Sequence, residues 1–348
     1  MINKKLLAEI CEVAGAPGHE QRVREIVIKQ VKPLVDEIRI DNMGNVVAIK
    51  KGKERKKVMI AAHMDEIGFI VTHVDDQGFI YFHTLGGFDP KTLTAQRVII
   101  HGKKDVIGVM GSKPIHLMSV ADRAKVPTIK DYFIDTGMTK KELDKLISVG
   151  DTITRDRKLI EMGDCLNCKS MDNRVSVFIL IEMLREMKNT PPYDVYAVFT
   201  VQEEIGIRGA NVSAMDINPD FGFGLDTTIA WDTPGSTKQE RVSALGEGAC
   251  IKVMDSSTVC DYRMVAYMKE IAKKKKINTQ LEILPAGGTD TSGVQRMNPG
   301  GSIAGAVSIP TRHIHQVIEM VNKKDVRAAI DLLRVCVENL DKYNWDFK

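Results

Sequence analysis

Side chains that can bind metal ions or transfer protons follow several apolar runs of this chain. His63 and Asp65 come after "VMIAA", and the adjacent acids Glu203 and Glu204 come after "VFTVQ". Asp226 follows "FGFGL" in the same way. Two further residues of these types complete the set, Asp172 in "KSMDNR" and His315 in "TRHIH".

The apolar runs have the length and composition of buried strands, so these polar residues are expected at strand ends or in the turns beside them. In open α/β sheets, the loops at the carboxyl ends of the strands converge on one crevice. Imidazole and carboxylate groups together suit zinc, cobalt or manganese better than calcium or magnesium. We therefore predict a site for two divalent cations. Its candidate ligands are two histidines, His63 and His315, two of the nearby aspartates and one glutamate of the adjacent pair; the aspartates are Asp65, Asp172 and Asp226. The alternative is a set of unrelated turn and capping acids.

The pair Glu203 and Glu204 suggests a division of labour. Successive residues of an extended segment point to opposite sides, so one acid can bind a metal ion while its neighbour stays free. A free carboxylate beside a metal-bound water can take its proton and pass it to a leaving amine. The pair therefore indicates metal-dependent hydrolysis, with one glutamate as ligand and the other as general base and acid.

The rest of the chain indicates two structural modules. Helical and strand patterns alternate before residue 69 and again after about 163, which predicts an α/β fold with a mixed, largely parallel sheet flanked by helices. Between them, short alternating strands joined by Gly and Asp turns predict an inserted β-rich, barrel-like module. We predict a catalytic α/β domain from residues 1–68 and 163–348, and an inserted β-rich domain from residues 69–162.

Composition argues against several other classes of protein. The net charge is +3 with both signs interspersed, so we expect no nucleic-acid partner. The apolar stretch near the start is interrupted by Glu9 and Glu12, and there is no run long enough to span a membrane, so we expect a cytoplasmic protein without membrane contact. Cys165 and Cys168 have the spacing of zinc ligands but no second matching pair, which favours ordinary thiols.

Six segments occur in the order and spacing of the TET-type metallo-aminopeptidases, peptidase family forty-two, some of whose members have been called glutamyl aminopeptidase or endoglucanase. They are "AAHMDEIGF", "KSMDNR", "VQEEIGIRGA", "GLDTT", "GGTDTSG" and "IPTRHIH". The resemblance extends from the first helix to the last. It implies a co-catalytic dinuclear aminopeptidase that removes N-terminal residues from peptides.

The resemblance also implies individual roles. One metal ion would be held by His63 and Asp226, a second by Glu204 and His315, with Asp172 bridging the two; zinc or cobalt is expected. Glu203 would be the general base and acid that activates a metal-bound hydroxide. Asp65 would orient His63. Gly287, Gly288 and Asp290 would form a loop beside the site.

In similar enzymes the inserted module forms dimers, and the dimers assemble into a hollow tetrahedral dodecamer, so the resemblance implies a homo-oligomer acting on peptides. Here "RHIHQVIE" departs from the usual residues around the last histidine, which leaves His313 as an alternative ligand to His315. Ala249 stands where proline is usual.

Two other enzyme classes and a non-catalytic role remain to be separated by experiment. A dinuclear deacylase or amidohydrolase needs a similar ligand set but no free α-amine on its substrate. A glycosidase sets its two acids roughly 5 to 9 Å apart across a cleft, which adjacent Glu203 and Glu204 do not suggest. In a non-catalytic assembly protein the ligand set would be incidental, and metal analysis would reveal that case.

Overall fold

The computed structural model describes residues 2–347 and contains one large sheet between two layers of helices. Four parallel strands form the centre of the sheet, in the order β12 (Tyr193–Thr200), β3 (Glu54–His63), β13 (Phe221–Ile229) and β16 (Ile303–Arg312). Helices cover both faces of these strands, which explains why their sequences are apolar almost throughout. The predicted mixed α/β sheet is confirmed.

Antiparallel strands extend this centre on both sides. β1 (Glu37–Ile40) and β2 (Val46–Lys50) lie beyond β12. On the other side, β16 pairs with β14 (Ala249–Met254), which continues to β15 (Thr279–Ile283), and with β17 (Glu319–Asn322). β17 continues to β11 (Cys165–Cys168) and β10 (Ile160–Met162). Residues 160–162, at the end of the segment expected to form the inserted module, thus pair within the large sheet.

Side chains alternate along β3, so that successive residues pack into two different apolar clusters on opposite faces of the sheet. Val58, Ile60 and Ala62 face a large apolar cluster, whereas Met59 and Ala61 face a smaller one on the opposite side. The large cluster includes residues of α1 (Lys4–Glu12), α2 (Gln21–Val31), α5 (Met171–Glu186), α7 (Tyr262–Lys275) and α9 (Lys323–Glu338). The smaller one includes residues of α6 (Arg208–Ile217) and α8 (Asp290–Arg296).

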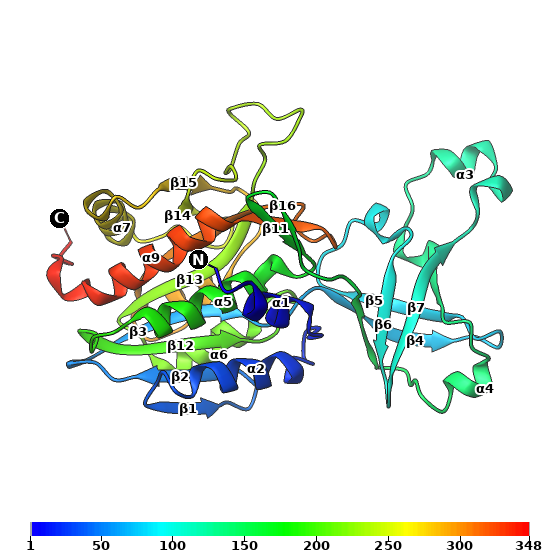
Figure 1. The fold of residues 1–348 in the computed structure, drawn as a ribbon, viewed down its shortest axis with the longest axis horizontal. Helices are drawn as coiled ribbons and strands as arrows, with labels where there is room; N and C mark the ends of the chain where they lie inside the picture. The colour runs from blue at the N-terminus through cyan, green and yellow to red at the C-terminus, as the bar shows by residue number, and fades with distance from the viewer. Residues whose placement is uncertain (1, 348) are drawn as a thin grey trace.

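A closed antiparallel barrel lies to one side of the α/β layers (Figure 1). Its strands follow the order β4 (Gly68–Val74), β5 (Ile80–Leu85), β8 (Tyr132–Asp135), β7 (Asp105–Ser112), β6 (Arg97–His101) and β9 (Thr152–Arg155). Phe69, Ile100 and Ile153 belong to its own buried core, separate from those of the sheet. The predicted inserted barrel is confirmed, and α3 (Val120–Ala124) and α4 (Lys140–Leu143) lie between its strands in sequence.

Several elements differ from the expectations drawn from the sequence. Residues 140–143 of the inserted module form only the short helix α4, and Cys165 and Cys168 lie on strand β11. β1 and β17 are short and were not anticipated. Among residues 2–347, every helix is either too short or too polar to cross a membrane.

Candidate metal centre and active site

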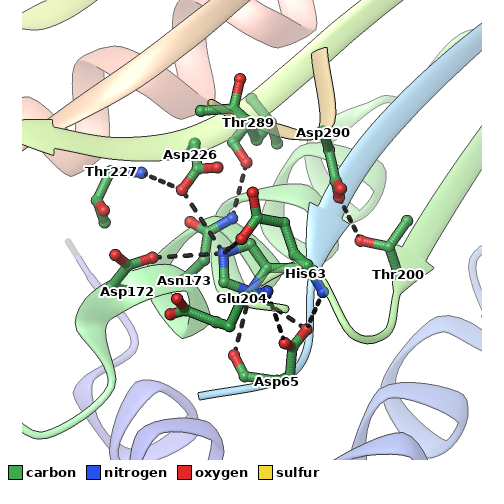
Figure 2. Close-up of polar contacts among 12 residues, drawn as sticks. His63, Asp65, Asp172, Asn173, Thr200, Glu204, Asp226, Thr227, Thr289 and Asp290 are labelled. Carbon is green, nitrogen blue, oxygen red and sulfur yellow. Dashed lines mark hydrogen bonds and ion pairs between the residues drawn. The ribbon is translucent and has the colours of Figure 1, made fainter. Parts of the chain in front are cut away.

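His63 lies at the centre of a group of carboxylates at the carboxyl end of β3. Its Nε2 is 3.4 Å from Asp172 Oδ1, at the start of α5, and 3.7 Å from Asp226 Oδ1 on β13 (Figure 2). The side chain of His63 is only 1% exposed. Asp226 Oδ1 also accepts a hydrogen bond from the backbone N–H of Thr227, which fixes its orientation. The end of β3, the start of α5 and a neighbouring parallel strand thus bring three donors together.

His315 forms a second group that shares Asp172 with the first. Its Nε2 is 3.5 Å from Asp172 Oδ2 and 3.4 Å from Glu204 Oε2. The two oxygens of Asp172 therefore face different histidines. His315 is the more accessible of the two, with 36% of its side chain exposed. It lies in the loop after β16, and Glu204 lies in the loop after β12.

These separations suit coordination of divalent cations. Donors about 2.0–2.2 Å from a tetrahedral ion are roughly 3.3–3.6 Å apart, close to the distances found in both groups. Donor atoms of His63, Asp172 and Glu204 all lie within 4.8 Å of one another. Asp172 Oδ1 and Glu204 Oε1 are buried and accept no hydrogen bond from the described residues. Bound cations would satisfy these oxygens, so the residues present fit a metal site.

The electrostatics of the cluster also favour cations. Burial works against the charged form of His63, but Asp172 and Asp226 outweigh it and raise its pKa well above the usual value. Burial likewise opposes charge on His315, yet Glu204 and Asp172 raise its pKa to about 12. Burial raises the pKa of Glu204 and Asp226, and repulsion from Asp172 adds to it in both. Bound cations would stabilise the carboxylates of this cluster as anions.

Asp65 organises the two glutamates as well as His63. Its fully buried carboxylate accepts the backbone N–H of Glu203 at 3.0 Å and that of Glu204 at 3.1 Å. His63 Nδ1 lies 3.1 Å from the Asp65 carbonyl oxygen and 3.5 Å from Oδ1. Because the carbonyl oxygen can only accept a hydrogen bond, it favours the neutral tautomer that carries its proton on Nδ1. The Nε2 lone pair of that tautomer is then available to a metal ion. Asp65 therefore connects the end of β3 with the loop after β12.

The side chains of Glu203 and Glu204 diverge because the chain turns, not because it is extended. Both residues lie beyond the end of β12, and Gln202 before them has a φ of 56°. The N–H groups of Gly206 and Ile207 bond back to the Glu203 carbonyl. Glu203 Oε2 is 3.8 Å from His63 Nε2. Burial, with repulsion from Asp226 and Glu204, raises the pKa of Glu203 well above its usual value despite the opposing effect of His63.

The group opens into a cavity of about 750 Å³. His63, Asp172, Glu203, Glu204, Asp226 and His315 all line it. Apolar side chains also line the cavity, among them Ile207, Ile229, Trp231 and Leu284. The cavity is large enough to receive the end of a peptide chain beside the polar cluster.

Only part of the loop formed by Gly287, Gly288 and Asp290 lines the cavity. Gly287 and Gly288 line the cavity. Gly287 has a φ of 73°, and a Cβ on Gly288 would lie 2.3 Å from Ser257 Oγ, so both positions favour glycine. Asp290 is buried at the start of α8 and accepts a hydrogen bond from the Thr200 hydroxyl (Figure 2). Burial raises the pKa of Asp290 to about 7.

Neither His313 nor the cysteine pair replaces the residues above. His313 lines the cavity, but it has a φ of 60° and lies past the end of β16, as His315 does. Both histidines therefore lie in a loop, where alternation along a strand does not relate their side chains. Cys165 and Cys168 are three residues apart on β11, so their side chains leave opposite faces of the strand. Both thiols are free.

Sequence reasoning missed two groups of residues around the site. Glu319 on β17 accepts backbone N–H groups from Asp172 and His315. Glu66, Lys169 and Arg174 form a buried ionic group, in which Lys169 Nζ lies 2.6 Å from Glu66. The only signal of Glu319 in the sequence is an acid within the apolar segment "QVIEMVN". An isolated acid of that kind is not distinctive before the fold is known.

A parallel-stranded α/β layer with a cluster of imidazoles and carboxylates at the carboxyl ends of its strands defines the class of metal-dependent hydrolases. The model of the M42 glutamyl aminopeptidase family matches residues 44–332. The chain is 37% identical to a putative aminopeptidase of Acetivibrio thermocellus over 329 residues, which cover 94% of this chain and 96% of that protein. The chain therefore belongs to the M42 aminopeptidase family and is a hydrolase of the exopeptidase type. Membership implies metal ions.

Solved structures agree with this assignment. An aminopeptidase from the archaeon Desulfurococcus kamchatkensis superposes with a TM-score of 0.92 at 37% identity, covering 96% of this chain and 94% of its own. The TET1 peptidase of Pyrococcus horikoshii, described as assembling into a tetrahedron or a large octahedral shell, superposes with a TM-score of 0.86 at 28% identity. That match covers 96% of this chain and 98% of the other. The fold, including the barrel, is thus the TET aminopeptidase fold.

Proposed function

We propose that the protein is a co-catalytic dinuclear aminopeptidase that releases N-terminal residues from peptides. The observation that carries the proposal is the pair of histidine groups that share Asp172. His63 and Asp226 would hold one ion, His315 and Glu204 the other, with one oxygen of Asp172 toward each. The mixed imidazole and carboxylate donors favour zinc or cobalt.

Two ions bound there would supply Lewis acidity, which acidifies a water molecule and polarises the scissile carbonyl. Glu203 would take the proton of the attacking water and deliver it to the leaving amine. Its carboxylate lines the cavity 3.8 Å from His63 Nε2, beside the proposed metal site, where a proton-transfer group is needed.

Asp65 would keep this arrangement ready before substrate binds. Its two backbone hydrogen bonds hold Glu203 and Glu204 in adjacent positions, so that one acid faces each histidine group. The apolar cavity walls at Ile229 and Trp231 would receive the peptide and exclude water from the reacting carbonyl. Asp65 thus acts by positioning, and Glu203 by proton transfer.

The proposed assembly is a homo-oligomer built from dimers, with a dodecamer as the expected form. The inserted barrel, whose strands lie between Gly68 and Arg155, would provide the dimer contacts. Its exposed apolar side chains at Ile107, Leu117 and Val120 support this proposal. Light scattering is expected to give a mass well above that of one chain, and a stable monomer would exclude the assembly.

The substitution Glu203→Gln tests the catalytic assignment. It keeps the size of the side chain but removes its ability to accept a proton, so kcat should fall by about 10²- to 10⁴-fold. Metal content, measured by mass spectrometry, should stay at the wild-type value. Glu240→Gln, on an exposed loop, is the matched control and should keep full activity. Near-normal turnover in Glu203→Gln would exclude this mechanism.

A further inference from the structure

Glu319 is a buried acid that the proposed chemistry does not use. It begins β17 and is 1% exposed. β17 is held between two neighbours, because Cys168 of β11 pairs with Glu319 and Thr311 of β16 pairs with Val321. The backbone of Glu319 is therefore fixed by the sheet, while its side chain extends toward the metal-ligating cluster.

The carboxylate of Glu319 contacts two of the proposed ligands through their backbones. Oε2 accepts the N–H of Asp172 at 2.9 Å, and Oε1 accepts the N–H of His315 at 2.9 Å. Asp172 opens α5, whereas His315 lies in the loop after β16, so this one carboxylate joins two distant parts of the chain. The side chains of these residues converge at 3.5 Å, on the side where the second ion would bind.

His315 needs such a restraint because of its backbone conformation. Its φ is 60°, in the left-handed region that residues other than glycine adopt at an energetic cost. A hydrogen bond from its N–H to a buried carboxylate compensates for part of that cost. Without this bond, the loop could return to a common conformation and move the imidazole away from Asp172 and Glu204.

The inserted barrel contributes to the same restraint. Arg155, at the end of β9, is 2% exposed, and its Nη1 donates to the carbonyl oxygen of His315 at 3.4 Å. Its guanidinium lies 5.5 Å from the centre of the Phe88 ring. His315 is thus held at its N–H by the large sheet and at its carbonyl by the barrel.

We propose that Glu319, supported by Arg155 from the barrel, is a positioning residue that holds Asp172 and His315 in place for the second metal ion. This inference rests on the proposed dinuclear function. It implies that the barrel helps to build the site of the same subunit. Removing the Glu319 carboxylate should weaken binding of the second ion most, because that site loses the positioning of both His315 and Asp172. Binding of the first ion should change less, because His63 and Asp226 do not contact Glu319.

The test is calorimetric titration of metal-free protein with zinc, a readout that does not depend on activity. Glu319→Gln keeps the side-chain volume, but its amide has one acceptor oxygen and places its NH₂ against the other N–H group. The affinity for the second ion should fall by about 10- to 100-fold, with the first changed by less than about threefold. Glu161→Gln is the matched control, because Glu161 is an exposed acid on β10 paired with Lys4 and Lys323. It should bind both ions as the wild type does.

Arg155→Gln provides an independent variant, which also decides the question if Glu319→Gln does not fold. It should cause a smaller loss at the second ion, and the double variant should lose less than the sum of the single losses. Wild-type affinity of Glu319→Gln for both ions would overturn the proposal. If Glu319→Gln does not fold, wild-type affinity of Arg155→Gln for both ions would overturn it instead. Failure of the proposed function would look different, because the wild type itself would bind fewer than two ions or would not cleave peptides when loaded.

Discussion

The substitution Asp65→Asn tests how far catalysis depends on the loop that carries the adjacent glutamates. The buried Asp65 carboxylate accepts the N–H groups of Glu203 and Glu204 with separate oxygens. Asparagine has nearly the same shape, but it keeps one acceptor and turns an NH₂ group toward the other backbone donor. One hydrogen bond to a charged acceptor is lost, which is worth about 1.5–3 kcal/mol.

If that free energy holds the loop in its reactive geometry, kcat/KM should fall by roughly 10- to 140-fold, at about 1.4 kcal/mol per tenfold. The assay is hydrolysis of aminoacyl p-nitroanilides by metal-loaded protein, with metal content measured in parallel. Asp75→Asn is the matched control, because Asp75 accepts the N–H groups of Gln77 and Phe79 in a barrel turn away from the site. Activity of Asp65→Asn within threefold of wild type would refute the reasoning.

Two predictions concern stability. Burial, together with repulsion from Asp65, raises the pKa of Glu20 to about 7, so the folded protein binds this proton more tightly than the unfolded chain does. That contribution is complete below the ordinary carboxyl pKa near 4.5 and is lost as pH rises through 7. The melting temperature of Glu20→Gln relative to wild type should therefore increase from pH 5 to pH 8, and a constant difference would contradict this. Lys169→Met leaves Glu66 with only the more distant Arg174, at 3.7 Å, and should lower the free energy of unfolding by about 3–5 kcal/mol. A change below 1 kcal/mol in urea denaturation would show that the pair is not needed.

The positions of the candidate site residues could be anticipated because parallel strands impose a simple rule. β3 and β13 are buried on both faces and are therefore continuous apolar runs, so the polar residue near the end of each run is conspicuous. His63 and Asp226 were identified in this way. The barrel was recognisable from its short alternating strands and Gly turns, since its core is separate from that of the sheet.

The local geometry could not be anticipated, because it depends on contacts between distant parts of the chain. The sequence predicts that Glu203 and Glu204 point apart because they alternate along an extended segment. In the structure their side chains point apart because the chain turns there, and Asp65 holds that turn. Glu319 acquires its contacts only when β17 lies between β16 and β11. Tertiary hydrogen bonds of this kind leave no periodic signal in a sequence.

The most direct test of the central claim is hydrolysis of matched peptides with free and acetylated N-termini by zinc- or cobalt-loaded protein. The account predicts cleavage of the free peptides alone, one N-terminal residue at a time. Activity should disappear with a chelator and return with added metal. Equal cleavage of the acetylated peptides, or activity that survives complete metal removal, would contradict the assignment as a metal-dependent aminopeptidase.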